Sequence, residues 1–303
     1  MTIAVDFFSD WKCYMLSYLI FHGYQVSQTE PLDAISYKFF NVRRRRIQAV
    51  PRAVHESPDI ACPVDYKAGY QSLKSKFVAG DDVIPHLSKN LLNADYEDPL
   101  LNDWGIHHFH LGKSLGSSGF TDRTGLLLFA FITPSDAYFI NVLPHGAWSD
   151  QDLVRILHRN WSTAISHFHL KGVLGLSLPI SNQTIKEFRK VGISTCVEVE
   201  QGVVYASMGG GYSTAGTSIE ATMQSGHYHQ HVQNMETYVR ENLDFFLKEI
   251  SELNRTPANP PAFSLVINNK GFYALETGSQ VAFLLHSHTL FPLSGQMRRP
   301  QEM

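Results

Sequence analysis

The chain has 303 residues, of which 44% are hydrophobic and 17% charged, and its formal net charge is −3 with histidine counted as neutral. This composition supplies enough apolar side chains for a sizeable core and excludes an intrinsically disordered protein. The nearly balanced charge favours no class of partner, and the length is at the limit of a single core, so we expect two domains.

The cysteines and the first residues bear on location. Cys13, Cys62 and Cys196 lie far apart with no paired spacing, which is typical of free thiols in a reducing compartment and provides neither a zinc ribbon nor a disulfide framework. Residues 1–11 contain no basic leader, and the apolar stretch 15–21 is too short to cross a bilayer. We therefore expect a cytoplasmic protein without a membrane anchor.

The first 50 residues predict a helix, a strand and a basic cluster. Residues 8–24 have Ser9 as a candidate N-cap and Gly23 near the end, as expected of a helix, and the alternating segment 34–40 predicts a strand. The cluster after this strand consists of Arg43, Arg44, Arg45 and Arg46. It fits either a solvated turn or a surface that contacts nucleic-acid phosphates.

After a predicted helix at 66–80, three apolar segments joined by short connections predict an antiparallel meander, at 104–112, 124–133 and 137–146. Alternation places His108 and His110 on one face of the first strand, and His107 on the other face with Phe109. We expect the more apolar face of Phe109 to meet a covering helix, and His108 and His110 to face an open cleft.

The covering helix is predicted at 149–168, with Ser149 as its N-cap. An antiparallel sheet covered by helices makes an α+β fold, which we assign to a first domain of residues 1–170. Residues 171–303 are predicted to form a second, mixed α/β domain. Its elements are strands at 173–180 and 194–208 around a helix at 180–192, a long helical region at 218–254 broken near Gly226, and terminal strands at 262–269, 271–276 and 280–288.

The histidines have three interpretations. His108 and His110, at i and i+2 on a strand, project two imidazoles to one side, as a metal-dependent hydrolase requires. Further histidines occur at His227, His229, His231, His286 and His288. No HExxH motif or cysteine pair fixes a third ligand, so we expect no metal and no cofactor. The histidines could instead be half-buried structural residues.

The third interpretation is acid/base catalysis. Cleavage of RNA by its own 2′-hydroxyl needs a base, an acid and a cation that stabilises the charged phosphorane. The meander offers His108 and His110 on the first strand, Arg123 before the second and His145 after the third, and the ends of neighbouring strands lie close together. Lys113, in the first connection, is a further candidate RNA contact.

A family resemblance covers residues 100–148. The order of a strand, a basic turn, RTGLLLFAFI, a short turn and AYFINVLPHG resembles the sheet of RelE/ParE-type bacterial toxins and related small endoribonucleases. The resemblance implies a fold that cleaves RNA, on the ribosome or elsewhere, with Arg123 and His145 at the matching places. This chain is longer than those toxins, and it is slightly acidic where they are strongly basic.

A glycine-rich segment precedes the long helical region. Gly209, Gly210, Gly211 and Ser213 could present backbone N–H groups to an anion at a helix N-terminus. The segment matches neither the Walker pattern nor GxGxxG, and a mobile loop is the alternative.

The leading hypothesis is a metal-independent endoribonuclease of toxin or defence type, whose partners are RNA and a cognate antitoxin or another protein. One alternative is a non-enzymatic binding or regulatory partner in a toxin or defence system, with structural histidines. The other is a metal-dependent hydrolase that uses the HHFH histidines.

Overall fold

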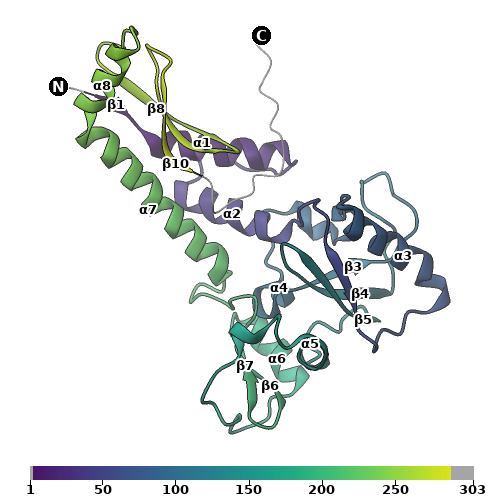
Figure 1. The fold of residues 1–303 in the computed structure, drawn as a ribbon. Helices are drawn as coiled ribbons and strands as arrows, with labels where there is room; N and C mark the ends of the chain where they lie inside the picture. The colour runs from purple at the N-terminus through teal and green to yellow at the C-terminus, as the bar shows by residue number, and fades with distance from the viewer. Residues whose placement is uncertain (1–2, 288–303) are drawn as a thin grey trace. The chain divides into compact units, whose positions relative to one another are not determined.

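The computed structural model describes residues 3–287 and has the predicted α+β class. Its contacts divide the chain into two units, one of residues 40–223 and one that joins residues 1–39 to residues 224–303 (Figure 1). The boundary predicted near residue 170 falls inside the first of these units. Apolar residues from both sides of it, such as Leu157 and Val197, share one core.

The unit 40–223 is built on a four-stranded sheet with the strand order β2-β5-β4-β3. The predicted meander is confirmed, because β3 (Ile106–His110) pairs antiparallel with β4 (Leu126–Ile132), and β4 pairs antiparallel with β5 (Asp136–Pro144). The fourth strand, β2 (Ala53–Glu56), adds to β5 in parallel.

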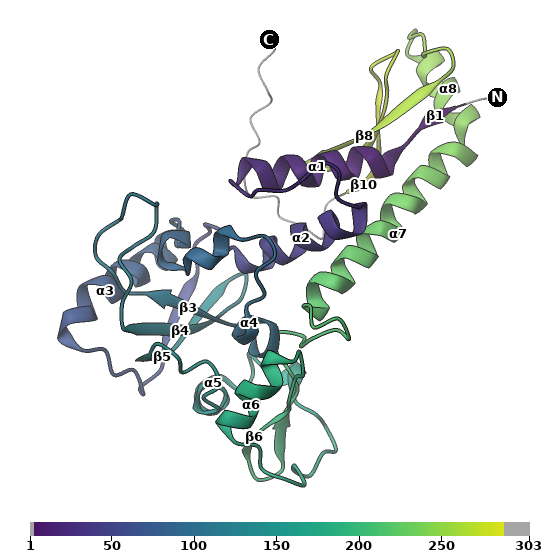
Figure 2. The same cartoon turned by 180° about the vertical axis from the view of Figure 1, so that it is seen from behind.

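Both faces of this sheet are covered (Figure 2). Helix α3 (Val64–Ala79) packs Leu73 and Phe77 on the face of Phe109. Helix α5 (Asp152–Trp161) packs on the opposite face, which contains Ile106. The prediction that the helix at 149–168 covers the face of Phe109 is wrong, because α5 packs on the opposite face and α3 covers Phe109. The face of His108 and His110 is therefore not open as predicted.

The remaining elements of this unit lie around the sheet. They are the 3₁₀ turns η1 (Ile84–His86), η2 (Lys89–Leu92) and η3 (Ser166–Phe168), the helices α4 (Pro99–Trp104) and α6 (Asn182–Lys190), and the hairpin of β6 (Val197–Glu200) and β7 (Val203–Tyr205). The predicted strand at 173–180 is wrong, because this segment has irregular backbone. Ser149 is not the N-cap of α5, since Gln151 occupies that position.

The other unit combines helices with a second sheet. Its helices are α1 (Phe7–Phe21), α8 (Leu243–Glu252), the first part of α2 (Leu32–Arg45) and most of α7 (Ile219–Glu241). Its sheet has the order β1-β8-β9-β10, from β1 (Ala4–Val5), β8 (Ala262–Asn268), β9 (Gly271–Glu276) and β10 (Ala282–Ser287). The predicted terminal meander is confirmed by the antiparallel pairs β8–β9 and β9–β10.

Two predictions for helical segments are corrected. The segment 34–40, predicted as a strand, belongs to helix α2, where Ile35, Phe39 and Val42 are buried at helical spacing. The long helical region breaks at Asn242 rather than at Gly226, which lies inside α7. No helix within residues 3–287 is long and apolar enough to cross a membrane.

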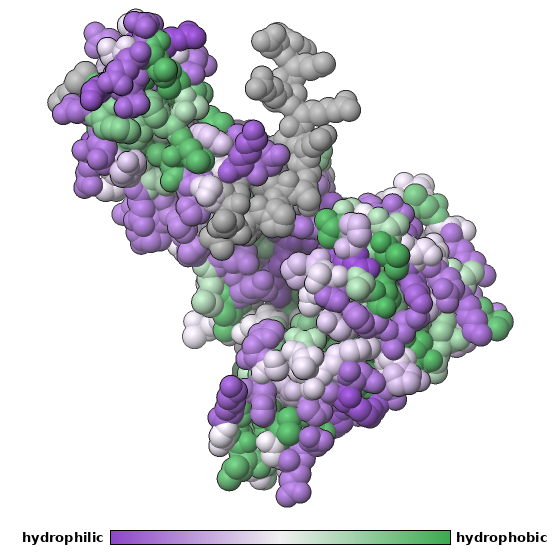
Figure 3. Space-filling view, viewed as in Figure 1, coloured by the Kyte–Doolittle hydropathy of each residue, from purple (hydrophilic) through white to green (hydrophobic). Residues whose placement is uncertain are grey.

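The face of the surface shown in Figure 3 mixes hydrophilic side chains with smaller hydrophobic areas. In the unit 40–223, Leu174 is 90% and Leu178 is 76% exposed. Both lie in the irregular segment that sequence periodicity predicted as a strand.

Candidate active site

The register of the first sheet brings three strand ends together. His110, at the end of β3, lies opposite Leu127 of β4, which in turn lies opposite Leu143 of β5. Arg123 precedes β4 and His145 follows β5, so the predicted catalytic residues gather at one end of the sheet. This juxtaposition follows from the antiparallel pairing, in which neighbouring strands lie about 5 Å apart.

Arg123 and His145 contact each other at the surface. The Nη2 atom of Arg123 lies 3.5 Å from Nε2 of His145, and both side chains are exposed. The backbone N–H of His145 donates to the carbonyl of Gly125 at 2.8 Å, which ties the end of β5 to the start of β4. Because a guanidinium only donates hydrogen bonds, Nε2 of His145 is the unprotonated acceptor in this arrangement.

Trp148 joins His145 to His108. The turn after β5 brings back the indole of Trp148, whose ring centre lies 5.0 Å from that of His145 and 4.5 Å from that of His108. Gly146 has a φ of 111°, a value that a residue with a side chain rarely adopts. The glycine therefore permits the tight return that places this aromatic ring between two imidazoles.

His108 is the less accessible of these two histidines. Its side chain is 12% exposed, and its Nδ1 lies 3.9 Å from Oδ2 of Asp98. Burial lowers the pKa of His108, as does the neighbouring His145, while the Asp98 carboxylate opposes the shift. The imidazole of His108 is therefore neutral at neutral pH, the form in which it can accept a proton.

His110 is buried rather than placed in a cleft. It is 4% exposed, and its Nδ1 accepts a hydrogen bond of 3.2 Å from the backbone N–H of Thr124. Burial, together with the nearby His108 and Arg123, lowers the pKa of His110 to about 4. The residue thus fixes the chain next to Arg123 and does not face a substrate.

His107 lies on the predicted apolar face, half-buried beside Phe109 at a ring distance of 6.2 Å. Burial lowers the pKa of His107 to about 3, although the Asp98 carboxylate raises it. Sequence reasoning missed three neighbours of the cluster, namely Trp148, Asp98 and His86, the last of which contacts the carbonyl of His110 through Nδ1 at 2.9 Å. The N-cap signal of Asp98 before a proline was the available clue.

The arginine cluster lies at the C-terminal end of α2, not in a turn after a strand. The guanidinium of Arg44 donates to Oδ1 of Asn102 and to the carbonyl of Leu101, and its Nε lies 3.2 Å from Glu220. Arg45 is 3% exposed and donates to carbonyls, including that of Asn93 at 2.9 Å. The prediction of a phosphate-binding surface is therefore wrong for Arg44 and Arg45.

The other predicted RNA contacts differ in accessibility. Arg43, in the last turn of α2, and Arg46, directly after the helix, are both half-buried. Lys113 is exposed in the β3–β4 connection, the segment that also contains Arg123. Of the predicted basic contacts, Lys113 is therefore the one that is exposed in the same connection as Arg123.

The glycine segment does not present free amides. The N–H groups of Gly209, Gly210 and Gly211 donate to the carbonyls of Asp103, Ser207 and Asn102 at 2.9, 3.0 and 2.8 Å, and that of Ser213 donates to Thr217 at 2.8 Å. The predicted anion-binding loop is therefore wrong. A Cβ on Gly209 would lie 1.9 Å from the carbonyl oxygen of Leu101, so a close backbone approach explains this glycine.

The remaining histidines do not form a metal-ligand set in the described part of the chain. Within residues 3–287, no group of three or more His, Cys, Asp or Glu side chains is arranged to hold a metal ion. His227 and His231 of α7 contact each other, with 3.0 Å between their Nε2 atoms. His229 lies near Asp33 and His286 near His231, whereas His288 lies outside the described residues.

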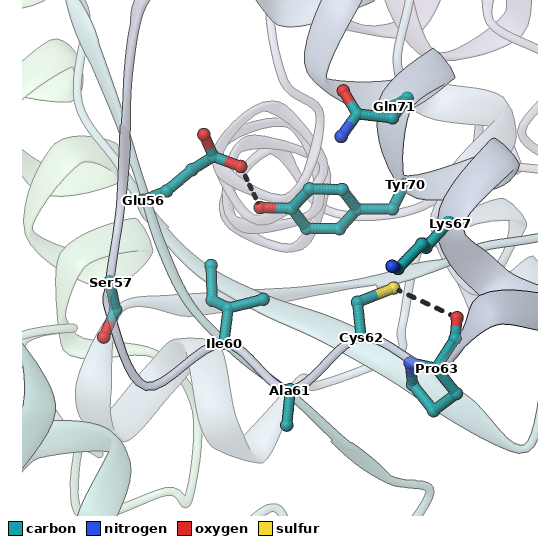
Figure 4. A pocket seen from close by; sticks show the side chains of 9 residues that line it. All are labelled: Glu56, Ser57, Ile60, Ala61, Cys62, Pro63, Lys67, Tyr70 and Gln71. Atoms are coloured by element: carbon teal, nitrogen blue, oxygen red, sulfur yellow. Dashed lines mark hydrogen bonds between the residues drawn. The ribbon is translucent and has the colours of Figure 1, made fainter.

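A pocket of about 680 Å³ lies between β2 and α3. Figure 4 shows Glu56 and Tyr70 directed toward each other across it, with the Tyr70 hydroxyl donating to the Glu56 carboxylate. Burial raises the pKa of Glu56, but hydrogen bonds from Lys74 and Tyr70 outweigh it, so the net pKa is lowered. This carboxylate stays ionised and already bonded, and the pocket lining contains no histidine.

No protein-family model matches the chain, and neither a curated protein nor a solved structure does. The cluster of His108, Arg123, His145 and Trp148 combines two imidazoles, a cation and an aromatic surface, and no other group described above does so.

Proposed function

We propose that the chain is a metal-independent endoribonuclease of toxin or defence type, with its active site at the end of the β3–β4–β5 meander. The observation that carries the proposal is the contact of the exposed Arg123 and His145 beside the neutral His108. Together these side chains supply the base, the acid and the cation that cleavage by a 2′-hydroxyl requires.

His108 takes the role of the base. Its buried, neutral imidazole accepts the proton of the 2′-hydroxyl, and O2′ then forms a bond to phosphorus. Arg123 is the cation beside the phosphorane, because a guanidinium binds phosphate oxygens through two parallel hydrogen bonds. An anionic phosphate is a better acceptor than imidazole, so Arg123 turns from His145 to the substrate.

His145 is then the acid. Once Arg123 pairs with the phosphate, Nε2 of His145 is free to carry a proton, which the adjacent phosphate charge favours. His145 gives this proton to O5′ as the bond between phosphorus and O5′ breaks. The products are a 2′,3′-cyclic phosphate and a 5′-hydroxyl, with no metal ion or cofactor required.

The surroundings of the cluster fit an RNA substrate. Lys113 is exposed on the same connection as Arg123 and supplies a second cation for the backbone. Trp148 is half-buried, and its indole is a surface on which an unpaired base can stack. The enzyme would act in the cytoplasm, in keeping with its free cysteines, and an antitoxin would block the exposed Arg123 and His145.

The test is cleavage of single-stranded RNA by the purified protein in the presence of EDTA. We expect fragments with 2′,3′-cyclic phosphate and 5′-hydroxyl ends, and no cleavage of the same RNA with 2′-deoxy sugars throughout. Cleavage of the deoxy substrate, or activity that needs an added metal ion, would contradict the proposed chemistry. Intact RNA together with harmless expression of the protein would favour a non-enzymatic regulatory role.

A further inference from the structure

Asp98 and His108 face each other beneath the candidate active site. Oδ2 of Asp98 lies 3.9 Å from Nδ1 of His108, and the two side chains are 15% and 12% exposed. Both residues line a cavity of about 20 Å³, which has room for one water molecule. At this distance the two groups make no direct hydrogen bond, but the carboxylate acts electrostatically on the imidazole, and the cavity has room for one bridging water.

The position of the Asp98 carboxylate is fixed by the helix that follows it. Oδ1 accepts hydrogen bonds of 3.1 Å from the backbone N–H groups of both Leu100 and Leu101, because Asp98 is the N-cap of α4. The other oxygen, Oδ2, is the atom that lies nearest to His108. One oxygen thus holds the carboxylate in place and the other is directed at the imidazole.

The imidazole of His108 has one nitrogen that no other group in the described part of the chain satisfies. Its Nδ1 is buried and has no hydrogen-bond partner within residues 3–287, although buried polar atoms nearly always have one. The indole of Trp148 packs against the ring at 4.5 Å. Arg45, Tyr96 and His107 also line the cavity.

We propose that Asp98 is a positioning residue that holds His108 in the tautomer protonated on Nδ1, which leaves Nε2 as the proton acceptor. In neutral imidazole only one nitrogen carries the proton, and a carboxylate beside Nδ1 stabilises the proton there. This proposal rests on the proposed function for its purpose, since an unprotonated Nε2 is what the base needs. Its structural claim, the tautomer of His108, concerns the free protein alone.

The experiment measures the tautomer of His108 by the ¹⁵N chemical shifts of its ring in the full-length protein. In the wild type we expect the proton on Nδ1. In Asp98→Asn, which keeps an N-cap acceptor for α4, we expect a mixture or the opposite tautomer and a lower pKa of His108. Asp95→Asn, a change at an exposed carboxylate three residues earlier, should leave both unchanged.

RNA cleavage gives the second measurement. For Asp98→Asn we expect kcat to fall by about 10²-fold with little change in KM, and the acidic limb of the pH profile to move to lower pH. The inference is overturned if His108 of the wild type is protonated on Nε2. It is also overturned if the tautomer of His108 is the same in the wild type and in Asp98→Asn. If the tautomer depends on Asp98 but the wild type cleaves no RNA, the proposed function is wrong, while the conclusion that Asp98 sets the tautomer of His108 remains supported.

Discussion

Arg123 and His145 are separated by 22 positions in the sequence, yet Nη2 of the first lies 3.5 Å from Nε2 of the second. The contact depends on the β4–β5 pairing, which places Leu126 opposite Pro144 and so brings the two flanking residues side by side. A guanidinium only donates hydrogen bonds, so in this contact the imidazole nitrogen of His145 lies on the acceptor side of Arg123. The register of the sheet thus places a cation beside an imidazole.

The first prediction concerns His145→Ala. The side chain is exposed, so we expect an unchanged melting temperature, while loss of the acid should lower the rate of RNA cleavage by about 10²- to 10⁴-fold. Single-turnover cleavage and thermal unfolding of the same preparation measure the two effects. His167→Ala, at an exposed histidine outside the cluster, is the matched control and should retain full activity. Equal activity of both variants would remove His145 from the mechanism.

The second prediction is that Arg44 contributes to stability, whereas Lys113 contributes to RNA binding. Arg44→Ala should lower the free energy of unfolding by roughly 2–4 kcal/mol, because it strips buried partners such as Asn102 of their hydrogen bonds. Lys113→Ala should leave stability unchanged and reduce the salt dependence of RNA binding by about one unit of slope.

Urea unfolding and RNA titrations at several salt concentrations measure these effects. Arg255→Ala, at an exposed arginine of the other unit, is the control for a plain loss of positive charge. An unchanged stability of Arg44→Ala would return the arginine cluster to the group of candidate RNA contacts.

Strand order and side-chain alternation could be predicted from the sequence in the meander because its connections are short. The segments of β3, β4 and β5 leave antiparallel pairing as the simple arrangement, and this pairing is what gathers Arg123, His108 and His145. The face of the sheet that each residue occupies could also be predicted from the sequence. The burial of His110 could not, because its exposure to solvent depends on which distant segments pack on that face.

Short apolar alternations and charge clusters were the unreliable signals. Residues 34–40 fit both a strand and a helix, since so short a window cannot separate the two periods. The four arginines looked exposed because charged side chains usually are. In α2, however, Arg44 and Arg45 donate hydrogen bonds to backbone carbonyls of residues distant in the sequence, such as Leu101 and Asn93. The residues around the arginines contain no pattern that predicts these partners.

The third prediction is that a side chain at position 209 destabilises the fold. A Cβ at this position would lie 1.9 Å from the Leu101 carbonyl oxygen and 2.6 Å from that of Asn102, and backbone atoms of α4 cannot move aside cheaply. We expect Gly209→Ala to destabilise the protein by about 3 kcal/mol. Gly226→Ala, at a helical glycine with no heavy atom within 4 Å of the added Cβ, should instead stabilise it by roughly 0.5–1 kcal/mol. A neutral Gly209→Ala would mean that this segment is mobile after all.

The last prediction concerns pH and His110. Burial lowers the pKa of His110 to about 4 in the folded protein, from the 6.5 that is ordinary for histidine. Between these two pH values the unfolded state binds the proton and the folded state does not, so folding stability is full above the higher value and falls as the pH decreases. The loss for this one group is of the order of 3 kcal/mol.

His110→Asn isolates this contribution, because the amide oxygen can still accept the hydrogen bond from Thr124 but does not titrate in this range. We expect the free energy of unfolding of this variant to fall less steeply between about pH 6.5 and pH 4 than that of the wild type, by up to one proton. His167→Asn, at an exposed histidine, should keep the wild-type slope. Urea unfolding at several pH values across this range measures the free energy of unfolding of the three proteins. Equal slopes of this free energy against pH would show that His110 is protonated as readily in the folded state as in the unfolded one.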